Sequence, residues 1–294
     1  MCDAKEYVAL QQECERLRAE NQRLNKCLAR YRAKYGELSE LDKGGEIGAL
    51  SAVEIKSGES KVHAPSSNVV LVTNQSPSEE KIKLFCSLFR GREDIYAKRW
   101  HSEKSGKSGY QPVCLNEWNT WLCDKRRTKC SECKNRKFAP LDDGAIYKHL
   151  QGKSPNGTDV VGIYPLTEDE HCYFLAMDFD GSSWEDDIVA VRAVCKKHEI
   201  PFLVERSRSG LGGHVWFFFA DKVCAVNARK FGTLLLNGAM QMRHSTRFSA
   251  YDRLFPNQDY MPKGGFGNLI ALPLQGMARR RGNSVFVDEN FVPY

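Results

Sequence analysis

The stretch Cys172-Tyr173-Phe174-Leu175-Ala176-Met177-Asp178-Phe179-Asp180-Gly181 is a short apolar run that ends in two carboxylates. Its strand-forming residues predict a β-strand, along which Asp178 and Asp180 share one face and Phe179 takes the other. Two carboxylates that point the same way repel each other unless cations lie between them. The stretch therefore predicts a strand with a divalent-metal site at its end.

A helix and two strands are predicted after this pair. Ser182 or Ser183 can cap the helix. Its apolar face recurs at helical spacing and consists of Trp184, Ile188, Val191 and Cys195. Apolar strands are predicted over residues 201–205 and 215–219.

A glycine-rich turn, Ser207-Arg208-Ser209-Gly210-Leu211-Gly212-Gly213-His214, lies between these two strands. Glycines let backbone N–H groups approach a phosphate closely, and Ser209 and His214 add side-chain donors. The turn is therefore predicted to bind a nucleoside triphosphate through Ser209, Gly210, Gly212, Gly213 and His214. Taken alone, His214 would be read as a histidine that merely begins a hairpin.

Four cysteines precede the apolar run: Cys114, Cys123, Cys130 and Cys133. The Cys-Ser-Glu-Cys pair has the two-residue spacing of zinc sites, and four thiolates close a tetrahedral shell. A closed shell predicts structural zinc, with the surrounding lysines and arginines facing a phosphate backbone. The alternatives are free thiols, or a shell in which His149 or Cys172 replaces Cys114.

The order of strand, Asp-Phe-Asp, helix, strand, Ser-Gly-Leu-Gly-Gly-His and strand resembles the catalytic module of the archaeo-eukaryotic primase superfamily. Residues 89–100, the cysteine cluster and residues 251–259 resemble the primase part of TOTE conflict systems. The similarity runs from about residue 85 to the end of the chain. Several separated motifs in the right order make it more specific than any one motif.

This resemblance implies an α+β fold: an RRM-like antiparallel sheet of primase-polymerase type, with an inserted zinc module. It implies template-directed joining of nucleotides, with or without a primer, by a DNA primase/polymerase. Asp178 and Asp180 would form the first metal motif, and Ser209 with His214 the nucleotide-contacting one. Asp252, on a strand that ends near Tyr251, would complete a site for two Mg²⁺ or Mn²⁺ ions. Asp259 competes for that third position.

Other basic residues near the end of the chain are candidates for phosphate contact. Lys263 precedes a glycine-rich turn and is assigned to nucleotide binding, and Arg279-Arg280-Arg281 could neutralise triphosphate or template phosphates. A solvated basic face is the equal alternative for the arginines. Residues 268–273 are predicted to add a buried strand to the catalytic sheet.

The N-terminal part has a different organisation. A heptad repeat over residues 7–31, with leucines in one column and Asn21 in the other, predicts a coiled coil that forms a parallel homodimer. A lone amphipathic helix is the alternative. The predicted domains are a coiled coil over 1–35, a flexible linker over 36–80 with one short strand at 69–72, and a primase-polymerase domain over 81–294 with its zinc module at 110–140.

Composition narrows the classes of protein. A net charge of +6 fits a nucleic-acid partner, and the apolar stretches are too short to cross a membrane. The start of the chain has no apolar signal core, so a cytoplasmic protein is expected, in which the eleven cysteines stay reduced. The expected partners are a single-stranded DNA or RNA template and nucleoside triphosphates, with a helicase or nuclease as fusion or partner.

Two other functions compete with synthesis. A non-catalytic module could bind single-stranded nucleic acid on an RRM-like sheet, although residues 215–219 lack the aromatic pattern of RNA-binding RRM strands. A nuclease could use the same paired acids to hydrolyse phosphodiesters. The glycine-rich turn favours a triphosphate substrate over a water nucleophile.

Overall fold

The computed structural model describes residues 72–243, 248–261 and 263–294. The predicted coiled coil at 1–35 and the strand at 69–72, except for Val72, lie outside these ranges, as does most of the linker. The first helix among the described residues, α2 (Ser78–Leu88), begins just inside the segment 36–80 that was assigned to the linker. Within the described part of the chain, no helix is both long and apolar enough to cross a membrane.

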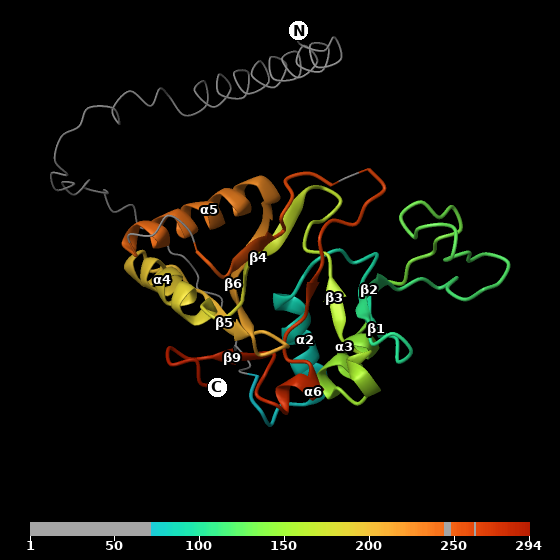
Figure 1. Cartoon of the computed structure of the whole chain (residues 1–294), viewed down its shortest axis with the longest axis horizontal. Helices are drawn as coiled ribbons and strands as arrows, with labels where there is room; N and C mark the ends of the chain where they lie inside the picture. Colours follow the sequence, from blue (N-terminus) through green and yellow to red (C-terminus); the bar gives the residue numbers. More distant parts are fainter. Residues whose placement is uncertain (1–71, 244–247, 262) are drawn as a thin grey trace, which may run out of the picture. The chain divides into compact units, whose positions relative to one another are not determined.

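The sheet that contains Asp178 and Asp180, called here the catalytic sheet after the role predicted for it, has five antiparallel strands in the order β7-β4-β6-β5-β9. These are β4 (His171–Asp180), β5 (Leu203–Arg206), β6 (Gly212–Cys224), β7 (Tyr251–Phe255) and β9 (Val285–Val287). The chain runs β4-α4-β5-β6-α5-β7, with α4 (Trp184–Lys197) and α5 (Ala225–Met242) packed on one face (Figure 1). This order and strand arrangement are RRM-like, as predicted.

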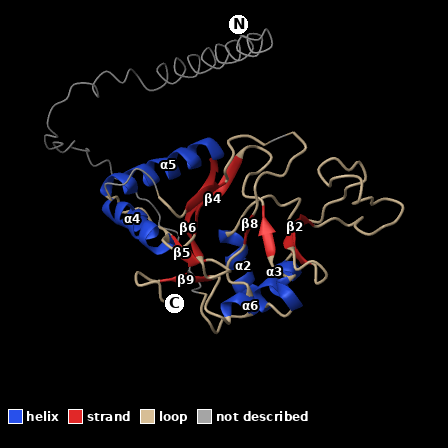
Figure 2. Cartoon of the chain, viewed as in Figure 1, coloured by secondary structure: helices blue, strands red, loops and turns tan. Residues whose placement is uncertain are grey.

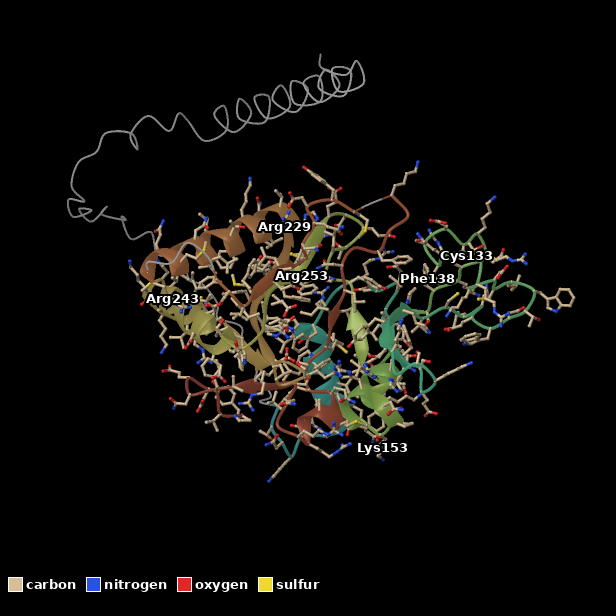
Figure 3. The ribbon with its side chains drawn as sticks, in the orientation of Figure 1. Cys133, Phe138, Lys153, Arg229, Arg243 and Arg253 are labelled. Atoms are coloured by element: carbon tan, nitrogen blue, oxygen red, sulfur yellow. The ribbon has the colours of Figure 1, made fainter. Side chains whose placement is uncertain are left out.

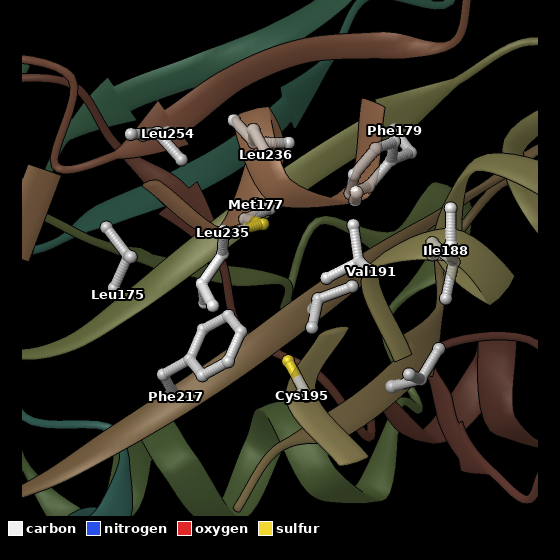
Figure 4. Packing of buried hydrophobic residues seen from close by; sticks show 14 of the residues in the cluster. Leu175, Met177, Phe179, Ile188, Val191, Cys195, Phe217, Leu235, Leu236 and Leu254 are labelled. Carbon is white, nitrogen blue, oxygen red and sulfur yellow. The ribbon is translucent and has the colours of Figure 1, made fainter. Parts of the chain in front are cut away.

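Alternation along β4 creates the main core. Leu175, Met177 and Phe179 point toward the helices and are fully buried. Figure 4 shows them gathered with Val191 of α4 and Leu236 of α5. The apolar face predicted for α4 is confirmed, because all four of its members are buried. Its N-cap residue, Ser183, makes no capping hydrogen bond and instead pairs with the Ser249 hydroxyl at 2.6 Å.

A second antiparallel sheet has the order β2-β1-β3-β8. Its strands are β1 (Ala97–His101), β2 (Ser108–Pro112), β3 (Val161–Ile163) and β8 (Ile270–Ala271). The prediction that residues 268–273 extend the catalytic sheet is wrong, because β8 pairs with β3 instead. The main chain of Gly162 lies opposite Ala271, and the Leu269 side chain fills the space where a Cβ of residue 162 would be.

The second core lies on the other face of the catalytic sheet. Phe174 and Trp216 from that face are fully buried together with Ile163 of β3 and Phe85 of α2. Three short elements complete this side: α3 (Asp143–Gln151), the 3-10 turn η1 (Pro155–Gly157) and α6 (Gly276–Arg279). Both faces of the sheet are therefore covered over much of their area.

Residues 114–138 lie in the connection between β2 and α3 and are called here the cysteine loop. Turns make up this segment, which contains no helix or multi-residue strand (Figure 2). A single antiparallel bridge between Cys114 and Phe138 closes its two ends. The region predicted as a zinc module is thus a separate loop, held at its base.

Candidate active site

Three aspartates from two neighbouring strands come together at the end of β4. Asp178 and Asp180 belong to β4 and Asp252 to β7, and each contributes an oxygen within 4.8 Å of the other two. Burial and then the charge of Asp178 raise the pKa of Asp180, an electrostatic situation that a divalent cation relieves. An all-carboxylate set of oxygen donors fits Mg²⁺ or Mn²⁺.

A β-bulge brings the third carboxylate into this group. Asp178 pairs with Arg253 while Phe179 pairs with Tyr251, so Asp252 is the extra residue of β7. The prediction of a strand ending near Tyr251 is wrong: β7 begins there and ends at Phe255, before Pro256, which has no N–H to donate. The bulge turns Asp252 toward the face that carries the β4 acids.

Asp259 has a different partner. Its carboxylate forms an ion pair with Arg229 of α5. Of the two candidates for the third acid, the structure therefore places Asp252 beside Asp178 and Asp180.

His214 is held between two carboxylates. Its Nε2 lies 3.3 Å from Asp178 Oδ1, and its Nδ1 lies 2.8 Å from Glu205 Oε2. Burial of the ring opposes its charge, but the charges and hydrogen bonds of Glu205 and Asp178 outweigh that effect and raise the pKa of His214 to about 10. A charged ring donates to Glu205 and forms an ion pair with Asp178, which holds the Asp178 carboxylate in place.

Sequence reasoning missed Glu205. This carboxylate is 1% exposed and also accepts a hydrogen bond from Trp216 Nε1 at 3.0 Å. The available signal was a charged residue at the end of an otherwise apolar strand, because a buried charge needs a partner.

Two glycines of the glycine-rich turn allow close packing against neighbouring elements. A Cβ at Gly212 would lie 2.4 Å from the Phe179 carbonyl oxygen, and one at Gly213 would lie 2.5 Å from the Trp184 ring. The N–H of Gly210, which has φ 80°, donates to the Ser207 carbonyl. Gly212 and Gly213 are thus required by β4 and α4, whatever binds at the turn.

Ser209 of the glycine-rich turn lines a basic pocket of about 470 Å³. Arg99 of β1, Arg208 of the turn and Arg281 after α6 line it together. Burial, and then the positive charge of the nearby Arg208, lower the pKa of Arg99. Three guanidinium groups around one pocket favour an anionic ligand.

The other two arginines of the predicted basic run have structural partners. Arg279 donates to the Leu150 carbonyl, and Arg280 to the Gln151 and Gly152 carbonyls at the end of α3. Cations at a helix C-terminus satisfy its last carbonyls. Only Arg281 of the run lines the basic pocket.

Lys263 lies in the loop that joins β7 to β8. The carbonyl of the next residue, Gly264, accepts a hydrogen bond of 3.5 Å from Arg136 of the cysteine loop. Within the described ranges, Lys263 forms no hydrogen bond or ion pair with Ser209 or with the three aspartates. Its assignment to nucleotide binding therefore has no geometric support in this structure.

The four predicted zinc ligands line one small pocket: Cys114, Cys123, Cys130 and Cys133. Burial raises the pKa of the Cys130 thiol, Lys125 lowers it, and the other three thiols raise it. His149 and Cys172 lie elsewhere, in the two cores. Among the described residues, only the three aspartates have donor atoms that all lie within 4.8 Å, so no three of these thiols are that close.

Comparison with known proteins identifies a family that matches most of the chain. Residues 80–294 match the model of the family described as "TOTE conflict system, Archaeo-Eukaryotic Primase domain". No curated protein matches the sequence. A solved structure described as "Polymerase Domain from Mycobacterium tuberculosis Ligase D in complex with DNA" is similar, with 11% identity and a TM-score of 0.41 over 67% of this chain and 72% of that chain.

Proposed function

The chain belongs to the archaeo-eukaryotic primase domain family of TOTE conflict systems, and from this membership we propose that it joins nucleotides on a single-stranded nucleic-acid template. The family itself suggests a nucleotidyltransferase. The observation that carries the finer proposal is the cluster of three carboxylates at the end of β4.

Each residue of the cluster has a role in this proposal. Asp178, Asp180 and Asp252 would hold two Mg²⁺ or Mn²⁺ ions, which when bound activate a 3′-hydroxyl and stabilise charge on the departing pyrophosphate. The three carboxylates would act by holding these ions in position through their negative charge. His214 orients Asp178, and Glu205 keeps the His214 ring charged and in place.

The basic pocket is proposed to bind the triphosphate of the incoming nucleotide. It adjoins the carboxylates through the turn, because Ser209 lines it and Gly212 pairs with Asp180. Arg99, Arg208 and Arg281 supply the charge-assisted hydrogen bonds that phosphate oxygens accept most strongly. A triphosphate bound in this pocket would have its α-phosphate beside the three aspartates.

The cysteine loop is proposed to hold one structural zinc ion through its four thiols. The loop has no helix or sheet of its own, and a metal supplies folding energy to such a segment. The four cysteines, with no carboxylate or histidine among them, form a closed set suited to structure.

The sheet surface argues against a module that only binds RNA in the manner of an RRM. Bases stack on the face of such a sheet that its helices leave free. Here Phe174 and Trp216 on that face are fully buried under the second core.

Purified protein is incubated with a single-stranded template, ribonucleotides or deoxyribonucleotides, and Mn²⁺, with and without a primer. Extended strands are expected, and Asp178→Asn should produce none. Shortened strands would indicate a nuclease. Strands that stay unchanged under every condition would reject synthesis.

A further inference from the structure

Two tryptophans of the cysteine loop lie in solvent. Trp118 is 78% exposed and Trp121 is 92% exposed. Their turn is well built, because the Asn119 side chain accepts from the Trp121 N–H at 3.0 Å and the Asn119 carbonyl accepts from the N–H groups of Leu122 and Cys123. Large exposed aromatic rings on an ordered turn mark an interaction surface.

The charge around these rings is positive. Residues 114–138 contain seven lysines and arginines and three acids, so this short segment carries a net +4 of the chain's +6. Six of the seven cations are exposed: Arg126, Arg127, Lys129, Lys134, Arg136 and Lys137. The half-buried Glu117 pairs with Lys125 and so adds little negative charge to the surface.

We propose that this surface, Trp118 and Trp121 with the exposed cations around them, binds single-stranded nucleic acid. Unpaired bases would stack on the two indole rings while the cations contact the phosphates between them. Stacking needs unpaired bases, which a duplex does not offer, and the positive charge matches a polyanion. Lys125 Nζ, 5.0 Å from the Trp118 ring centroid, supports one of the two rings from within the loop.

The loop that carries Lys263 connects this surface to the strand of the third acid. Phe138, at the base of the cysteine loop, packs edge-on against Phe266 at 5.1 Å, and Arg136 reaches the Gly264 carbonyl. That loop continues directly from β7, which holds Asp252. Figure 3 shows Cys133 among the projecting loops and Phe138 nearer the sheets. A single-stranded nucleic acid bound here would serve as the template. That role rests on the proposed function, whereas the binding itself does not depend on it.

The test uses the whole chain as purified and fluorescein-labelled dT20 and rU20, with no added Mg²⁺ or Mn²⁺ and no chelator. Anisotropy is expected to show binding that Trp121→Ala weakens about tenfold and Trp118→Ala weakens similarly. Trp121→Phe should keep most of the affinity, whereas Trp121→Leu should not. Lys129→Ala should weaken binding and make its logarithmic salt slope less steep by about one.

Matched variants separate the explanations. Leu234→Ala removes a side chain that is 70% exposed on α5 and should bind like the parent. Asp178→Asn should also bind normally, so loss of synthesis and loss of binding are separate results. Affinities of both tryptophan variants within twofold of the parent, at unchanged zinc content and melting temperature, would overturn the inference. A change only in self-association would show instead an interface between copies.

Discussion

At the scale of single residues, the position of Asp252 depends on one irregularity. Without the bulge, side chains along β7 would alternate strictly between the two faces of the sheet. Asp252 would then pair with Phe179 and lie on the face opposite to Asp178 and Asp180. The extra residue lets Tyr251 pack on Phe179, with ring centroids 5.8 Å apart, while Asp252 reaches the acids. Bulges often redirect a side chain beside an active site.

Asp252→Asn is expected to abolish nucleotide addition, because Asn offers a metal a neutral oxygen in place of an anion. Asp259→Asn should retain a substantial part of it, since that carboxylate pairs with Arg229. Primer extension with Mn²⁺ measures both. Activity in the first variant and none in the second would mean that Asp259 is the third ligand.

A buried histidine makes stability depend on pH. His149 accepts from the Val161 N–H at 3.1 Å and donates to the Pro273 carbonyl at 2.8 Å, and burial lowers its pKa to about 4. Between pH 6.5 and 4 the unfolded chain binds a proton that the folded chain does not, so stability falls as the pH falls.

Replacing this histidine should remove that dependence. His149→Gln is expected to be less stable than the parent at pH 7, because the two buried hydrogen bonds are less well made. The difference in free energy of unfolding between the parent and His149→Gln should be about 2 kcal/mol smaller at pH 5 than at pH 7. Urea unfolding at both pH values measures it, and an equal difference at both would show that His149 is not the titrating group.

At the scale of elements, helix α4 lies against the end of β6 only because residue 213 has no side chain. Gly213→Ala is expected to lower stability by about 1–3 kcal/mol, because the new Cβ would lie 2.5 Å from the Trp184 ring. Gly238→Ala in α5 is the matched control: its Cβ would lie 3.5 Å from Val194, so it should stabilise the helix by about 0.5–1 kcal/mol. Equal effects in thermal denaturation would contradict the packing argument.

The cysteine loop as an element is expected to depend on metal. Metal analysis should find about one zinc ion per chain, and Cys130→Ser should lower both zinc content and melting temperature. Cys224→Ser is a suitable control, because Cys224 is exposed on the catalytic sheet. Full zinc occupancy in Cys130→Ser would point to other ligands.

At the scale of the whole molecule, the second sheet and its helices cover the sheet face that a free RRM would expose. The acids, the basic pocket and the cysteine loop are thereby joined to one another through β1, β2 and the loop after β7. Arg99 enters the pocket from β1, so the second sheet contributes to the candidate site as well as to the core.

The N-terminal heptads remain a prediction at this scale, since they lie outside the described residues. Removal of residues 1–35 is expected to turn dimers into monomers that still synthesise, because a lone Asn in a leucine seam favours a parallel pair. Light scattering at micromolar concentration measures both forms. A monomeric full chain would reject the dimer.

The sequence by itself determined the parts of the site that depend on local period. Alternation predicted β4 with Asp178 and Asp180 on one face, and helical spacing predicted the buried face of α4. Only the tertiary structure decided which distant segments meet: the bulge at Asp252, Glu205 behind His214, the three arginines of the basic pocket, and β8 in the second sheet. Strand pairing and register arise from contacts between residues far apart in the chain, which no local pattern records.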